Sequence, residues 1–163
     1  MGQVVAEIKG GEKLEAFLSD MAKKVSNPAT LRVGFLEGGT YPDGTSIPMV
    51  AALNEYGGNM SEYGTATTHY NAPTPPRPFF RTMVANKSKG WARTLTKLLK
   101  ENNYDAVEAL NLMGDGIKGQ LQDSIANGGW APNKPSTLKR KAGTQPLIDT
   151  SDMWNSVRWE VKT

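Results

Sequence analysis

The sequence has no cysteine and a single histidine, His69, among its 163 residues. Without cysteine the chain forms no disulfide, no cysteine-ligated zinc or iron–sulfur site and no thiol nucleophile. A histidine metal site or a Ser-His-Asp triad within one chain would depend on His69 alone. This residue lies among threonines with no acidic neighbour in sequence, which favours a surface position. We therefore expect no enzymatic activity, no cofactor and no metal.

The sequence also lacks a long hydrophobic run. No stretch reaches the roughly 18 apolar residues that a membrane span requires, and the N-terminal segment has no apolar core of a secretory signal. We expect synthesis in a cytoplasm and no membrane partner. The composition, 38% hydrophobic and 21% charged, predicts one globular domain over residues 1–163. A net charge of +3 is too small to mark a dedicated nucleic-acid binder.

The spacing of hydrophobic residues predicts helices that alternate with two strands. The expected elements are a helix over 11–25, a strand over 30–37, a helix over 46–56, two long helices joined near Asn102-Asn103, a helical turn at Met153 and a closing strand over 156–162. In the closing strand, Val157, Trp159 and Val161 alternate with polar residues, which indicates one apolar face. This order predicts an α+β fold: a small antiparallel or mixed sheet with amphipathic helices packed on one face.

A protruding loop is predicted over about 57–76, because this stretch is rich in glycine, threonine, asparagine and proline and is longer than most connections in a compact domain. The alternative is that it contains a strand in TATTHYN, 65–71. The run at the end of the predicted loop, 73–77, has the P-x-x-P-basic spacing of peptides that dock on aromatic grooves. Its flanks, however, have the composition of a folded domain. The interpretation as a peptide ligand is therefore the weaker one.

We interpret the run instead as a rigid proline brace. Pro76 and Pro78 fix the direction of the chain, Phe79 and Phe80 enter the core, and Arg77 reaches outward toward a neighbouring chain. Replacing Phe79 by alanine should then cost about 3–5 kcal/mol of stability. Replacing Arg77 by alanine should leave the monomer folded and weaken assembly.

Two motifs suggest ligand chemistry but have simpler explanations. The segment GDGIKG, 114–119, matches the dinucleotide fingerprint, yet it lies inside a helical stripe rather than between a strand and a helix. We interpret its glycines as sites where another backbone approaches closely. The basic segment 134–141 contains Lys134, Lys139, Arg140 and Lys141, which could neutralise phosphates. A run of four cations without interleaved aromatic residues is usually a solvated face.

Three segments, in this order, resemble the tail-completion or head–tail joining proteins of long-tailed bacteriophages: VGFLEGGTYPDGTSIPMVAALNEYG, PPRPFFR and GWAPNKPSTLKRKAGTQPLIDTSDMWNSVRWEV. The match spans Val33 to Val161. The matching positions are Asn54, Glu55, Tyr56 and Gly57; Pro76, Arg77, Pro78 and Phe79; Trp130, Pro132, Thr137 and Lys141; and Leu147, Asp149, Thr150 and Ser156. Ser151 stands where the family usually has glycine, so we expect that this turn needs no positive φ. The loop over 57–76 is longer than the usual connection.

The resemblance implies a structural virion protein that assembles as a ring, expected to be hexameric, at the phage neck. Its implied partners are head-completion or connector proteins, tail terminator or tail tube proteins, and genomic DNA in transient, non-specific contact inside the lumen. The protein would be made in the bacterial cytoplasm. An alternative from another class stays open, a soluble DNA-binding or regulatory module that uses the basic segment 134–141.

We predict two sets of residues that serve this role. The predicted assembly contacts are Arg77, Glu55, Tyr63, His69, Lys139 and Arg140. The predicted brace and core residues are Pro76, Pro78, Phe79, Phe80, Trp130, Leu147, Asp149 and Thr150.

Overall fold

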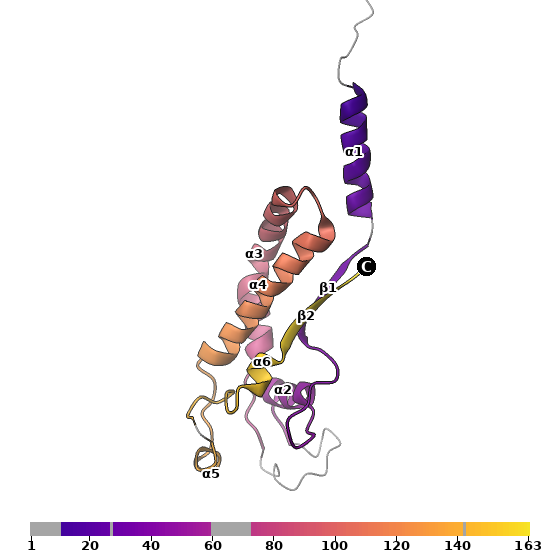
Figure 1. Ribbon diagram of the computed structural model, residues 1–163. Coiled ribbons are helices and arrows are strands. Elements are labelled where there is room, and N and C mark those ends of the chain that lie inside the picture. The colour runs from indigo at the N-terminus through magenta and orange to yellow at the C-terminus, as the bar shows by residue number, and fades with distance from the viewer. Residues whose placement is uncertain (1–10, 27, 60–72, 142) are drawn as a thin grey trace, which may run out of the picture.

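The computed structural model describes residues 11–26, 28–59, 73–141 and 143–163, which form six helices and two strands (Figure 1). In chain order these are α1 (Gly11–Ser26), β1 (Thr30–Phe35), α2 (Ile47–Tyr56), α3 (Phe79–Glu101), α4 (Ala106–Asn127), α5 (Pro135–Leu138), α6 (Asp152–Asn155) and β2 (Val157–Lys162). The predicted α+β class is confirmed.

The sheet has two antiparallel strands, with Thr30 opposite Lys162 and Phe35 opposite Val157. One face carries the apolar residues of both strands, and Val157 on this face is fully buried. The other face is polar, where Arg32 and Glu160 approach to 3.7 Å. The strand faces expected from the alternating pattern are confirmed, and α4 covers the apolar face.

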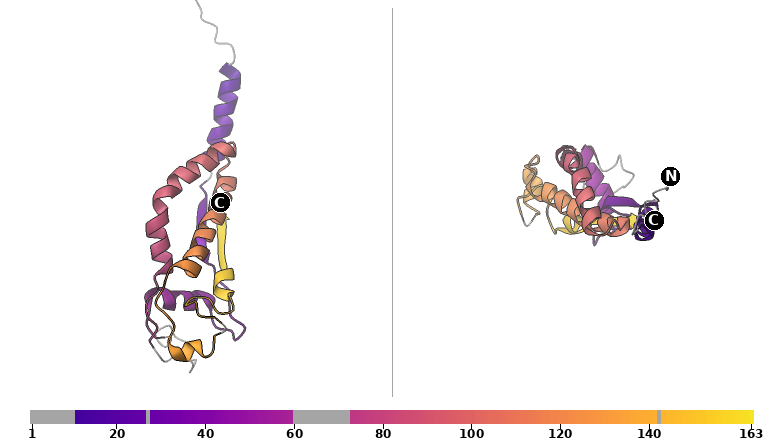
Figure 2. Two further views of the ribbon diagram at one scale, coloured as in Figure 1. Left: turned by 90° about the vertical axis from the view of Figure 1, so that its left-hand side faces the viewer. Right: turned by 90° about the horizontal axis from the view of Figure 1, so that it is seen from above.

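Helix α4 forms the centre of the molecule, between the sheet on one side and α3 on the other (Figure 2). Asp105 caps its N-terminus, because the carboxylate accepts a hydrogen bond of 3.0 Å from the backbone N–H of Glu108. Its buried residues recur every three or four positions, as a core-facing helix requires. They are Ala109, Met113, Gly114, Ile117, Leu121 and Ile125.

Phe79 opens α3 and lies in this core, where it is only 1% exposed. Its ring packs edge-on against Phe35 of β1, with the ring centroids 6.1 Å apart. Phe80 is half-buried and packs against the core from outside. The prediction that Phe79 enters the core is confirmed, so the expected cost of its truncation stands.

The glycines of the segment 114–119 lie inside α4, as the helical stripe predicts. Only Gly114 is at a close approach: a Cβ there would lie 2.9 Å from Leu31 and 3.0 Å from the ring of Trp159. Gly116 and Gly119 are exposed, with open space around them. The interpretation is therefore wrong in two respects, since one glycine is involved rather than three and it meets side chains of the sheet rather than backbone.

Helix α1 stands beyond the end of the sheet, away from the rest of the chain (Figures 1 and 2). Leu14, Phe17 and Leu18 are each more than half exposed, at 59%, 55% and 54%. The predicted helix is confirmed, but the expectation that the helices pack on a sheet face is wrong for α1. The helix continues the line of β1 instead of turning back, so its apolar side chains do not reach the core cluster of the described residues.

The turn before α6 differs from expectation. Ser151 has φ 68°, in the left-handed region, so the position does need a positive φ although it holds serine. Its hydroxyl does not cap the helix; instead the hydroxyl of Thr150 donates a hydrogen bond to the carboxylate of Asp152. Leu147 is buried as predicted, whereas Asp149 and Thr150 are exposed and so do not belong to the core.

The strained backbone at Ser151 generates a prediction about stability. A non-glycine residue in the left-handed region costs roughly 1–2 kcal/mol, and glycine removes this cost while losing about 0.4–1 kcal/mol through greater freedom of the unfolded chain. Ser151→Gly should therefore raise the free energy of unfolding, by about 0.5–1 kcal/mol. Urea denaturation measures this, with Ser151→Ala as the control that keeps a Cβ. An equal gain in both variants would contradict the explanation.

Candidate functional site

Arg77 is buried, with only 5% of its surface exposed, and the prediction that it reaches outward is wrong. Its Nη1 donates to the side-chain oxygen of Asn54 at 2.6 Å, and its Nε donates to the carbonyl of Ala131 at 2.9 Å. Its Nη2 donates to Asn133 Oδ1 at 3.2 Å and to the carbonyl of Pro132 at 3.5 Å. Burial lowers the pKa of Arg77, but a guanidinium in a protein keeps its charge. We call these five residues the Arg77 cluster.

Arg77 turns inward because several acceptors converge on it from two parts of the chain. Asn54 is itself fixed, since its amide donates to the carbonyl of Val50 at 2.9 Å. The backbone N–H of Arg77 also donates to the carbonyl of Asn54 at 2.6 Å. The fork of five guanidinium N–H groups suits such a set of fixed oxygens, where one ammonium group would not.

Glu55 is likewise 5% exposed, which contradicts its prediction as an assembly contact. Its carboxylate accepts hydrogen bonds from the backbone N–H groups of Phe80 at 2.8 Å and Arg81 at 3.1 Å. The guanidinium of Arg81 donates to the same carboxylate at 2.8 Å. The first residues of α3 have no partner within the helix, and Pro78 before them offers no capping side chain. Glu55 therefore caps α3 and complements its helix dipole.

Gly57 allows the chain after the predicted loop to pass close to the end of α2. It has φ 76°, and a Cβ there would lie 3.0 Å from both the nitrogen of Pro76 and the carbonyl oxygen of Thr74. Next to it, Gly58 and Thr74 form an antiparallel bridge. The two ends of the loop over 57–76 are thus held together. Tyr63 and His69, which are predicted assembly contacts, lie outside the described residues, as does the alternative strand over 65–71.

Trp130 fixes the segment that supplies carbonyls to Arg77. Its indole N–H donates to the carbonyl of Ser124 at 2.7 Å, and the Ser124 hydroxyl donates to the carbonyl of Phe79 at 2.8 Å. The ring also lies over Gly128, where a Cβ would come within 2.1 Å of it. Trp130 therefore has the structural role that was predicted for it.

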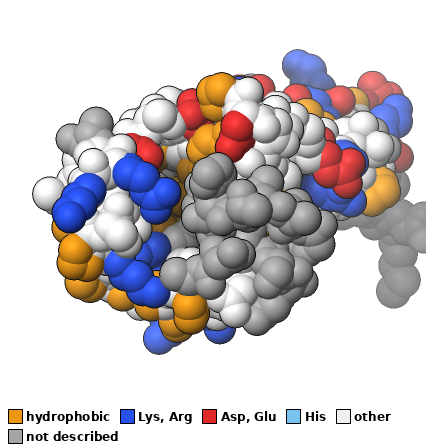
Figure 3. All heavy atoms as spheres, turned by 90° about the horizontal axis from the view of Figure 1, so that it is seen from below, with side chains coloured by type: hydrophobic (Ala, Val, Ile, Leu, Met, Phe, Trp, Pro, Cys, Tyr) orange, Lys and Arg blue, Asp and Glu red, His pale blue; other side chains and the backbone are white. Residues whose placement is uncertain are grey.

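A groove with a cavity volume of about 590 Å³ adjoins the Arg77 cluster at the end of the molecule that carries α5. Its lining has charges of both signs: the cations Arg77, Lys134, Arg140 and Lys141, and the carboxylates Asp43, Asp149 and Asp152. Figure 3, which views this end, shows lysine and arginine side chains gathered beside a hollow. Mixed charge does not favour a polyanion over other ligands.

The basic segment 134–141 is partly engaged within the chain. Lys134 donates to the carbonyl of Pro73 at 3.1 Å, and Lys141 donates to the carbonyls of Gln145 and Pro146 at 2.7 and 3.3 Å. Burial lowers the pKa of Lys141, although the charge of Asp149 opposes this shift. Lys139 and Arg140 are exposed, as their prediction as contacts requires.

Among the residues that the structure describes, no group of three or more histidine, aspartate or glutamate side chains is arranged to hold a metal ion. None of the described helices is long and apolar enough to cross a membrane. The arrangement around Arg77 holds segments of backbone together, and most of its polar groups are used for that purpose. The exception is Asn133 Nδ2, which is buried without a hydrogen-bond partner in the part of the chain that the structure describes. Exposed apolar and cationic side chains outside this arrangement remain available for contact.

The Arg77 cluster predicts that Arg77→Ala destabilises the monomer, contrary to the expectation from sequence. The change leaves Asn54 and two carbonyls without their donor, and losing hydrogen bonds to a buried charge costs roughly 1.5–3 kcal/mol or more. We expect a loss of about 3 kcal/mol in the free energy of unfolding, measured by urea denaturation. Arg77→Lys should recover little, because lysine lacks the fork.

The matched control is Arg93→Ala, which removes an exposed arginine and should change stability by about 0.5 kcal/mol or less. If Arg77→Ala proved as stable as this control, the structural role of the Arg77 cluster would be refuted.

We compared the chain with family models, with curated proteins and with solved structures, and none of them matches it.

Proposed function

We propose that this protein is a structural virion subunit of a tailed bacteriophage, which forms a ring at the neck and joins the head to the tail. One observation carries the proposal. The segments on which the resemblance rests lie apart in sequence, but they meet at the Arg77 cluster: Asn54 from the first segment, Arg77 from the second, and Pro132 from the third. A fold whose resembling positions contact one another supports a true relationship more strongly than isolated short motifs do.

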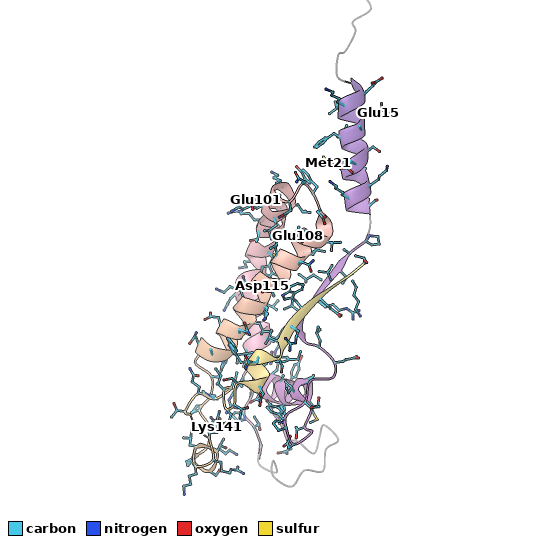
Figure 4. All side chains as sticks on the ribbon, in the orientation of Figure 1. Glu15, Met21, Glu101, Glu108, Asp115 and Lys141 are labelled. Carbon is cyan, nitrogen blue, oxygen red and sulfur yellow. The ribbon has the colours of Figure 1, made fainter. Side chains whose placement is uncertain are left out.

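The surface that α1 presents supports assembly with other chains. Leu14, Phe17 and Leu18 lie on one face of a helix that does not contribute to the core. Figure 4 shows α1, with Glu15 and Met21 labelled, apart from the rest of the molecule. A helix of 16 residues is marginal in water by itself, so an exposed apolar face on such a helix favours a partner chain. In a ring, this partner is the neighbouring subunit.

The alternative, a DNA-binding or regulatory module that uses the basic segment 134–141, has less support. Lys134 and Lys141 donate to backbone carbonyls of the same chain. Only two of the four cations in that segment, Lys139 and Arg140, are exposed without such a contact. Two cations provide little of the counterion release that drives DNA binding.

Particles made by a phage that lacks this protein test the proposal. We expect full heads and finished tails that do not join, so that infectivity is lost, while supplying the protein in trans restores it. Electron microscopy of complemented virions with a label on the C-terminus should locate the label at the neck. Normal infectivity without the protein, or label found elsewhere on the virion, would refute the neck role.

The α1 surface predicts a separation between folding and assembly. Replacing Leu14, Phe17 and Leu18 together by glutamine should leave the unfolding transition of the body within about 0.5 kcal/mol of the wild type, because these side chains do not contribute to the core. The ring should be lost, which light scattering coupled to size-exclusion chromatography measures as a fall to the monomer mass. The control, Ala16→Gln, lies on the opposite face of α1 and should leave the mass unchanged. A triple variant that kept the oligomer mass would contradict the role of α1.

A further inference from the structure

The outer surface of α3 is positively charged. The helix contains six lysines and arginines against one glutamate, whereas the whole chain has a net charge of only +3. The rest of the chain is therefore net negative, and the mild basicity of the protein is concentrated on α3. In the sequence these cations are spread between apolar residues of the same helix, and the structure shows which of them lie on its uncovered side.

Four of these cations form a line. Lys89, Arg93, Lys97 and Lys100 are spaced by four, four and three residues, which places them on one side of a helix. All four are exposed, and at 1.5 Å of rise per residue they extend over about 16 Å. We call these four residues the α3 stripe.

The α3 stripe faces away from the body of the protein. Helix α4 contacts α3 from one side and the sheet from its own opposite side, so α3 is the outer layer (Figure 2). The only carboxylate in α3 is Glu101, at its C-terminal end, 3.7 Å from Lys97. This pair is exposed at 73% and 55%, so it neutralises the stripe weakly.

We propose that the α3 stripe is a contact surface for the phosphate backbone of duplex DNA. A single-sign line of exposed cations fits a regular polyanion, and duplex DNA presents roughly one phosphate per 3.4 Å along each strand, enough for every cation in the stripe. The contact carries no sequence information, since it reaches phosphates rather than base edges. This inference deepens the proposed function and rests on it for the source of the duplex, which is the genome that passes through the ring.

Other partners fit the stripe less well. A helix that binds a membrane surface presents large apolar residues beside its cations, but the exposed large hydrophobic residues of the described chain lie on other elements than α3. A protein interface is usually centred on buried aromatic residues, and Trp91 of α3 instead turns inward and donates to Gln120 of α4 at 2.9 Å. The groove at the other end has mixed charge.

A small number of exposed cations per subunit also suits a duplex that has to move through the ring. Each phosphate contact adds a small, salt-sensitive attraction, and a ring repeats the stripe once per subunit. Attraction that is distributed and free of base readout allows the duplex to slide, where tight local binding would hold it.

Equilibrium binding of the full chain to a short fluorescent duplex of mixed sequence, measured by anisotropy over a series of salt concentrations, tests the inference. The test variant combines Lys89→Gln, Arg93→Gln and Lys97→Gln. The slope of log K against log [salt] is negative, and its magnitude decreases by about 0.9 for each phosphate that the protein no longer neutralises. We therefore expect the magnitude of the slope to decrease by about 3 in this variant. The affinity for the duplex at low salt should be at least about tenfold weaker.

Two controls separate the stripe from general charge. Lys13→Gln, Lys23→Gln and Lys24→Gln together remove three cations from α1 and change the net charge equally. Lys139→Gln with Arg140→Gln removes the exposed cations of the basic segment. Both controls should keep the slope within about 1 of the wild-type value. An equal loss in the α1 control, a larger loss in the basic-segment control, or no duplex binding by the wild type would each overturn the inference.

Binding of the protein to vesicles of phosphatidylglycerol but not to the duplex would overturn the inference in favour of a lipid surface.

The failure of the neck proposal and the failure of the stripe proposal are distinguishable. If a phage without the protein is fully infectious while the stripe variant still loses duplex binding, the neck role fails and the stripe stands. If the deletion blocks head–tail joining while the stripe variant binds duplex as well as the wild type, the stripe fails and the neck role stands.

Discussion

The two hydrogen bonds that Arg77 donates to Asn54, one from its backbone and one from its side chain, are the interaction on which the packing around α2 and the start of α3 depends. They join the end of α2 to the start of α3, and each is 2.6 Å long. From there the guanidinium reaches the 131–133 segment. A buried charge requires partners for nearly all of its donors, because an unmet donor costs a large desolvation energy. This requirement fixes the relative positions of three distant segments far more narrowly than apolar contact would.

Glu55 provides the complementary constraint one residue later in α2. Its carboxylate caps α3 where Pro78 offers no side-chain oxygen, and it also pairs with Arg81, whose guanidinium lies 4.9 Å from the ring of Tyr56. The neighbouring residues Asn54 and Glu55 thus hold the same brace from two sides. The prolines restrict the direction of the chain, so that Phe79 lies in the core and the guanidinium of Arg77 lies within hydrogen-bond distance of its acceptors.

The molecule has a packed body and, apart from the contacts that stabilise it, surfaces that are exposed to solvent. The body consists of α2, α3, α4 and the sheet, whose polar groups near Arg77 are largely satisfied internally. Two surfaces are exposed: the apolar face of α1, which lies apart from the body, and the cationic outer side of α3. Helices α1 and α3 lie at different places on the molecule (Figure 4). This separation supports the proposal that neighbouring subunits and DNA contact the exterior of the protein.

Local pattern in the sequence predicted five of the six described helices, both strands and the α+β class, because hydrophobic periodicity and turn residues act over a few positions. The short helix α5 was not predicted, since its four residues are too few to show a periodic pattern. The local pattern also determined that Phe79 belongs to the core. The inward direction of Arg77, the capping role of Glu55 and the left-handed turn at Ser151 were decided only by the tertiary structure. Arg77 and its partners are 23 to 56 residues apart, so no local pattern signals that their oxygens converge. The same is true of α1 and α3: the sequence shows an apolar face and scattered cations, but only packing decides that these faces stay uncovered.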